Sequence, residues 1–97
     1  KNIAHNGLMD VILIISKKGN LDRNPIINIR GLPFNDEELD ECFYEMEDEI
    51  LKTSKAYSLN NKKHEKNLID ALKSNLKKII YSKTRKRPYT NITLIRV

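Results

Sequence analysis

The chain has 97 residues and a formal net charge of +5, with 32% charged and 39% hydrophobic residues. This length suits one domain over residues 1–97, and the composition is typical of a water-soluble globular protein, which excludes collagen-like and low-complexity chains. The single cysteine, Cys42, excludes an internal disulfide framework, so we interpret it as a small core residue and expect a reducing, cytoplasmic location.

The first predicted strand runs from Leu8 to Ser16, because Val and Ile are frequent in it and the turn-forming residues 17–20 follow. Its apolar run Val11–Ile15 is far too short to span a membrane, and Asp10 argues against a signal peptide. Both faces of the strand are apolar, so one must cover the domain's own core. The other needs a cover from elsewhere in the chain or from a second subunit. One face would present Met9, Val11, Leu13 and Ile15, and the other Leu8, Ile12 and Ile14.

A second strand is predicted from Pro25 to Arg30, where Ile27 and Ile29 alternate with polar residues. Proline has no backbone N–H, which suits the first position of a strand. The link over residues 17–24 is short, so we expect an antiparallel hairpin with the first strand.

Two amphipathic helices are predicted next. The first begins after Asn35, because Asn35 and Glu38 have the spacing of a capping box. The second runs from about Lys62 to Lys83, and Pro88 forbids its continuation. Steps of three and four residues place the apolar side chains of each helix on one stripe. The stripes contain Leu39, Cys42, Phe43, Met46 and Ile50 in the first helix, and Leu68, Leu72, Leu76, Ile79 and Ile80 in the second.

The last predicted strand runs from Thr90 to Val97, where Ile92 and Leu94 alternate with Thr93, Ile95 and Val97. The element order is therefore β-β-α-α-β. We predict an α+β fold of two layers, in which a small three-stranded sheet is covered on one face by the two helices. The other face of the sheet stays open.

Charge is divided unevenly along the chain. Residues 1–49 carry five basic and eleven acidic side chains, whereas residues 50–97 carry thirteen basic and two acidic ones. The basic half predicts an anionic partner, and the alternative is two solvated helix faces of opposite sign that pack side by side. The cluster Lys83, Arg85, Lys86 and Arg87, flanked by Tyr81 and Tyr89, is a candidate RNA or domain contact. Cations at a helix end also complement the helix dipole, which is the alternative explanation of this cluster.

The sequence contains no motif for catalysis or for a metal ion. His5 and His64 stand alone, without a CxxC, HxH or HExxH pattern. The carboxylates of the first helix have neither a partner histidine nor the apolar surroundings that favour acid–base chemistry. We therefore predict no catalytic residue, no metal site and no self-contained enzyme in this chain.

Several short motifs occur in a recognisable order. Gly7-Leu8-Met9 opens an aliphatic strand, Gly19 follows it, and Pro25-Ile26-Ile27 leads to Arg30-Gly31. Lys83-Thr84 with Arg85, Arg87 and Pro88 then precedes the closing strand. In this order and spacing the motifs resemble the C-terminal domain of ribonuclease J, from about His5 to Val97. Ile29 stands where that family usually has a serine.

The resemblance implies that the chain is cut from a longer protein, in agreement with a first residue that is Lys1 rather than Met. Ribonuclease J enzymes are metallo-β-lactamase/β-CASP nucleases that carry two zinc ions in an N-terminal domain and degrade RNA by 5′-to-3′ exonucleolytic and endonucleolytic cleavage. Their C-terminal domain is implicated in dimerisation and in supporting activity. The implied partners are a second subunit in a homodimer, the catalytic domain of the same chain and RNA through the parent enzyme, with no membrane. No cofactor is expected in this part of the protein, and zinc is expected in the parent's catalytic domain.

Two hypotheses of different classes therefore stand. In the first, the chain is a non-catalytic assembly domain whose candidate dimer interface comprises Leu8, Met9, Val11, Ile12, Leu13, Ile14 and Ile15. In the second, it is a stand-alone RNA-binding module that uses its basic half, although its strands lack the aromatic pattern of an RNA-recognition sheet. Arg30 is a candidate contact to RNA or to the catalytic domain, and the alternative is a plain surface arginine.

Overall fold

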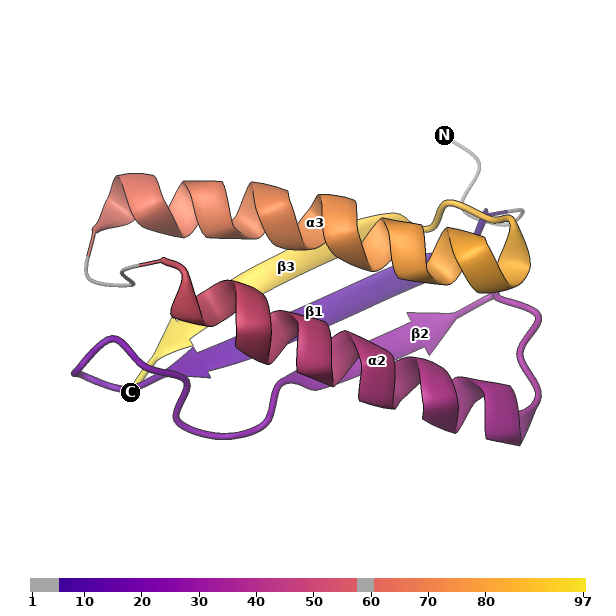
Figure 1. The fold of residues 1–97 in the computed structure, drawn as a ribbon, viewed down its shortest axis with the longest axis horizontal. Helices are drawn as coiled ribbons and strands as arrows, with labels where there is room; N and C mark the ends of the chain where they lie inside the picture. Colours follow the sequence, from indigo (N-terminus) through magenta and orange to yellow (C-terminus); the bar gives the residue numbers. More distant parts are fainter. Residues whose placement is uncertain (1–5, 58–60) are drawn as a thin grey trace.

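Figure 1 shows the fold in a computed structural model, which describes residues 6–57 and 61–97. Three strands form one mixed sheet in the order β2-β1-β3, and two long helices lie over the same face of it. The elements are β1 (Leu8–Ile15), β2 (Ile26–Arg30), α2 (Asp36–Lys55), α3 (Lys62–Thr84) and β3 (Tyr89–Arg96). The two-layer α+β fold and the order β-β-α-α-β predicted from the sequence are confirmed.

Strand β1 lies in the middle of the sheet and forms a ladder on each edge. Strand β2 is antiparallel to it, from Leu8 opposite Arg30 to Ile12 opposite Ile26, which confirms the predicted hairpin. Strand β3 is parallel to β1 along all eight residues. Parallel neighbours need a long connection, and here β2, α2 and α3 all lie between the two strands in the sequence.

The hydrophobic core lies between the sheet and the helices. Its main side chains come from β1 and from one stripe on each helix, and each is at most 1% exposed. They are Met9, Val11, Leu13 and Ile15 from β1, Cys42, Met46 and Ile50 from α2, and Leu68, Leu72, Leu76 and Ile80 from α3. Phe43 and Ile79 pack against this core, and Leu39 is half-buried, so the predicted stripes are confirmed.

The helix starts follow from their capping residues. The Asn35 side chain accepts a hydrogen bond from the Glu38 N–H at 2.8 Å, and the Glu38 carboxylate accepts one from the Asn35 N–H at 3.0 Å. Asn61 caps α3 in a similar way, because its side-chain oxygen accepts the Lys63 N–H at 2.8 Å. Residues 58–60, which lie between the two helices in the sequence, are outside the described residues.

The entry into β1 depends on a glycine. Gly7 has a φ of +81°, and a Cβ atom there would lie 2.8 Å from both the Arg30 carbonyl oxygen and the Leu32 side chain. Only glycine fits this close approach without displacing the backbone. Gly7 and Arg30-Gly31, which belong to separate motifs in the sequence, therefore meet at one end of the sheet.

We predict that Asn35→Ala lowers the free energy of unfolding by about 1 kcal/mol, because the substitution leaves the Glu38 N–H without its acceptor. Urea denaturation measures this loss. Asn67→Ala is the matched control, since Asn67 is exposed within α3 and caps nothing. Alanine is the better helix former at such a position, so the control should be neutral or slightly stabilising. Equal losses in the two variants would contradict the capping role.

Candidate functional site

The sheet face that points away from the helices is the first candidate site, and we call it the open face. No described segment covers it, and the three strands alternate so that every second side chain points to it. The open face contains Leu8, Asp10, Ile12 and Ile14 from β1, Ile26, Asn28 and Arg30 from β2, and Tyr89, Asn91, Thr93 and Ile95 from β3.

The strand register divides the open face into a polar and an apolar part. Asp10 lies between Asn28 and Asn91, which makes a polar row across all three strands. One row further along β1, Ile12 pairs with Ile26, and beyond it Ile14 pairs with Ile95. Ile26 and Ile95 are 49% and 43% exposed. We call Ile12, Ile14, Ile26 and Ile95 the apolar patch.

The seven residues predicted as a dimer interface lie on both sides of the sheet. Met9, Val11, Leu13 and Ile15 point into the core beneath the helices, where each is at most 1% exposed. The other three candidates, Leu8, Ile12 and Ile14, lie half-buried on the open face. Of the two faces that the sequence left open, the helices cover the one with Met9 and Val11, and no described segment covers the one with Leu8, Ile12 and Ile14.

The basic cluster at the end of α3 is divided by the structure. Lys83 turns towards α2, where its ammonium lies 3.0 Å from Glu45 Oε1, and this hydrogen bond raises the pKa of Lys83. Arg85 and Arg87 turn the other way, with their guanidinium carbons 5.4 and 4.3 Å from the centre of the Tyr81 ring. Lys86 is half-buried, and its N–H donates to Thr84 Oγ1 at 3.0 Å.

Arg85 and Arg87 line a shallow depression of about 400 Å³ beside α3, which we call the basic depression. Lys77 and Lys78 join them there, so four cations surround the depression. Its other lining residues are Ser74, Tyr81 and Ser82. Lys77 and Lys78 are not part of the cluster predicted from the sequence. Their spacing of three and four residues from Tyr81 was the signal, because residues at that spacing share one helix face.

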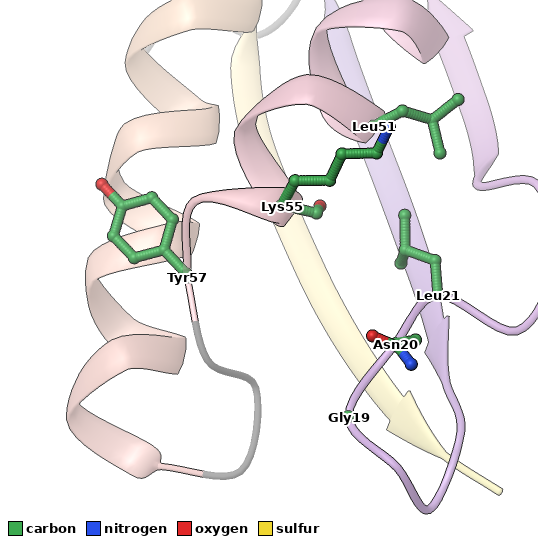
Figure 2. Close-up of a pocket in the computed structure, with 7 residues that line it drawn as sticks. Gly19, Asn20, Leu21, Leu51, Lys55 and Tyr57 are labelled. Atoms are coloured by element: carbon green, nitrogen blue, oxygen red, sulfur yellow. The ribbon is translucent and has the colours of Figure 1, made fainter.

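Figure 2 shows a second depression, of about 400 Å³, between the loop after β1 and the end of α2. It is lined by Gly19, Asn20, Leu21, Leu51, Ser54, Lys55 and Tyr57. Ser54 is 8% exposed, and its hydroxyl has no hydrogen-bond partner among the residues that the structure describes. None of the lining residues is a carboxylate or a histidine, so the depression lacks the histidine and carboxylate partners of a Ser-His-Asp arrangement.

Cys42 and His64, the other reactive side chains considered from the sequence, do not form a site together. Cys42 is buried in the core, whereas His64 is exposed in the first turn of α3. His5 lies outside the described residues. Over residues 6–57 and 61–97, the structure brings no three His, Cys, Asp or Glu side chains together in a group able to hold a metal ion. Neither helix in this range has the length and apolar character that a membrane span requires.

Arg30 lies at the polar end of the open face, opposite Leu8 in the β1–β2 ladder. Arg30 is exposed, and the strand register places it on the open face. It forms no ion pair with any carboxylate of the described residues, including those of α2. Arg30 is therefore placed to contact a molecule outside this fold.

Comparison with known families gives one informative result. The family model described as the ribonuclease J C-terminal domain matches residues 1–97. No curated protein matches the chain significantly. The family resemblance noted in the sequence is therefore confirmed over the whole chain.

We predict that Cys42 is protected from alkylation in the folded chain. Burial raises the pKa of its thiol to about 11, although the nearby Lys83 ammonium opposes part of the rise. Because the pKa is higher in the folded state, the protonated thiol favours folding fully below the usual pKa near 9, and this contribution is lost as the pH rises towards 11. At pH 8, iodoacetamide should label the native chain far more slowly than the urea-unfolded chain. Cys42→Ala should remove part of the stability loss above pH 9, and rapid labelling of the native thiol would contradict the prediction.

Arg30→Ala should change the free energy of unfolding by about 0.5 kcal/mol or less, because the side chain has no partner in the described fold. Urea denaturation of the 97-residue chain measures this change. In the longer protein the same substitution should lower assembly or activity. An unchanged oligomeric state together with unchanged activity would limit Arg30 to a plain surface role.

Proposed function

Because the chain belongs to the ribonuclease J C-terminal domain family, we propose that it is the assembly domain of a longer ribonuclease. In this proposal, residues 1–97 form one non-catalytic domain that joins two subunits into a homodimer. The domain thereby supports the parent enzyme, which degrades RNA in the cytoplasm by 5′-to-3′ exonucleolytic and endonucleolytic cleavage. The zinc ions and the hydrolytic chemistry belong to the catalytic domain of the parent, which is the domain's other partner.

The observation that carries the proposal is the apolar patch on the open face. Ile26 and Ile95 are almost half exposed, and they flank the outer side chains of the central strand. Exposed apolar patches rimmed by polar residues are characteristic of protein–protein interaction sites. Removing it from water would contribute about 25 cal/mol for each square ångström buried.

The polar part of the open face limits how two copies can pack. In a two-fold symmetric dimer each patch contacts its own copy, so the apolar patch belongs near the symmetry axis. Asp10 lies in the row next to Ile12. Two Asp10 carboxylates buried against each other would be costly, so the row with Asn28 and Asn91 belongs towards the hydrated rim. Two sheets packed in this way would enclose a second apolar layer about 10 Å thick.

We predict that the double substitution Ile26→Lys and Ile95→Lys raises the dimer dissociation constant at least about tenfold, which corresponds to about 1.4 kcal/mol. The reason is that two charged side chains would have to be desolvated within the interface. Analytical ultracentrifugation over a range of concentrations measures the constant.

The matched control is Tyr44→Lys with Leu51→Lys, which also replaces two exposed apolar side chains by lysine but on α2, in the other layer. This control should dimerise as the unmodified chain does. A chain that remains strictly monomeric at high micromolar concentration would contradict self-association through this domain. It would leave the alternative, a stand-alone RNA-binding module, as the better hypothesis.

A further inference from the structure

We infer that the basic depression beside Tyr81 binds the phosphate groups of a single RNA strand. The choice of phosphate as the ligand rests on the lining side chains alone. The choice of RNA as its source also rests on the proposed function, because a ribonuclease brings RNA to this surface.

The charges of the basic depression are unbalanced. Lys77, Lys78, Arg85 and Arg87 line it, no carboxylate does, and none of the four forms an ion pair with the residues that the structure describes. Other cations of the helices differ, since Lys52 pairs with Asp48 and Lys83 with Glu45. Four like charges around one depression repel one another, and a bound polyanion relieves that repulsion.

The two arginines contact the Tyr81 ring without any ligand present. Arg87 stacks closely over the Tyr81 ring at 4.3 Å, and Arg85 lies at 5.4 Å from the ring centre. A ring contact of this type restrains the guanidinium plane while its N–H edge stays available. A restrained guanidinium suits two parallel hydrogen bonds to a phosphate better than a flexible ammonium does. The Ser74 hydroxyl adds a neutral polar group to the same wall.

Arg85 lies at the backbone position that ends α3, and both arginines line the same depression. Arg85 ends α3 with a φ of 61°, in the left-handed region, and it is the one non-glycine residue of the described chain with a positive φ. Glycine usually occupies this position after a helix. The charge of Arg85 also complements the dipole at the end of α3, but the helix dipole does not require the contact with the Tyr81 ring that places Arg85 at the basic depression.

The position of the basic depression also fits RNA in the parent enzyme. The segment after α3 leads directly into β3, and the Tyr89 N–H donates to the Gly7 carbonyl at 3.0 Å. The end of α3, whose residues line the depression, therefore lies near the end of the sheet where the chain enters β1 (Figure 1). In the proposed parent enzyme the catalytic domain precedes this entry point, so RNA near the junction would pass close to the depression.

The test is fluorescence anisotropy with a labelled ten-nucleotide oligouridine and the 97-residue chain at several salt concentrations. Lys77→Gln with Lys78→Gln should weaken binding about tenfold at low salt and reduce the salt slope by about 0.7 for each phosphate that the variant no longer neutralises. Lys62→Gln with Lys63→Gln is the matched control, because it removes two exposed lysines from the other end of the same helix. The control should weaken binding about twofold at most, through net charge alone.

Two arginine variants separate binding from folding. Arg87→Lys keeps the charge but removes the planar stack on Tyr81, so RNA affinity should fall while the thermal midpoint stays close to that of the unmodified chain. Arg85→Gly should also lower affinity, and its midpoint should not fall, because glycine adopts the left-handed conformation readily.

The remaining outcomes decide against the inference. Absence of RNA binding at low salt, or equal reductions in affinity for the two lysine pairs, would overturn it. Competition by millimolar inorganic phosphate as strong as that by unlabelled RNA would identify a site for free phosphate rather than for a strand. Polyglutamate that competes as well as RNA would point to an acidic protein partner.

The Ile26→Lys and Ile95→Lys variant should retain RNA binding, so a failure of the dimer proposal remains distinguishable from a failure of this one.

Discussion

The pairing of β1 with a strand on each of its edges organises the rest of the molecule. The side chains of β1 that point inward, among them Met9 and Leu13, form the sheet side of the core. Both helices bury their apolar stripes against these side chains. Because side chains alternate along a strand, the same pairing places Ile12 and Ile14 on the opposite face, where no described segment covers them. The core and the apolar patch are thus two results of a single aliphatic strand that has helices on only one side.

The two candidate surfaces lie on different layers and have different chemistry. The apolar patch belongs to the sheet, and its contacts would depend on buried area. The basic depression belongs to the end of α3, and its contacts would depend on charge and would weaken with salt. An assembly role and an RNA-binding role need not exclude each other, because occupying one surface leaves the other accessible.

The sequence predicts much of this arrangement, for local reasons. Asn35 and Glu38 fix the start of α2, and the apolar stripes fix which helix faces are buried. The sequence shows that both faces of β1 are apolar, but it does not say which of the two faces the helices cover. The helical spacing places Lys77 and Lys78 on the face of Tyr81, but the grouping with Arg85 and Arg87 was missed, because those two residues follow the end of α3 and reach the Tyr81 ring only in space. Lys83 does not join these four cations because it pairs with Glu45, which lies far away in the sequence and close in space.

The parallel pairing of the first and last strands has a consequence for how the protein is made. The β1–β2 hairpin involves neighbours in the sequence, so it can form early, whereas Leu8 meets Tyr89 only after both helices have been synthesised. Closing so long a loop is slow in comparison with local contacts. On the ribosome, the edge of β1 that later pairs with β3 would stay exposed until the last strand emerges. Chaperones would therefore have the longest access to an unpaired aliphatic strand, and a premature stop before Tyr89 would leave that strand as a site of aggregation.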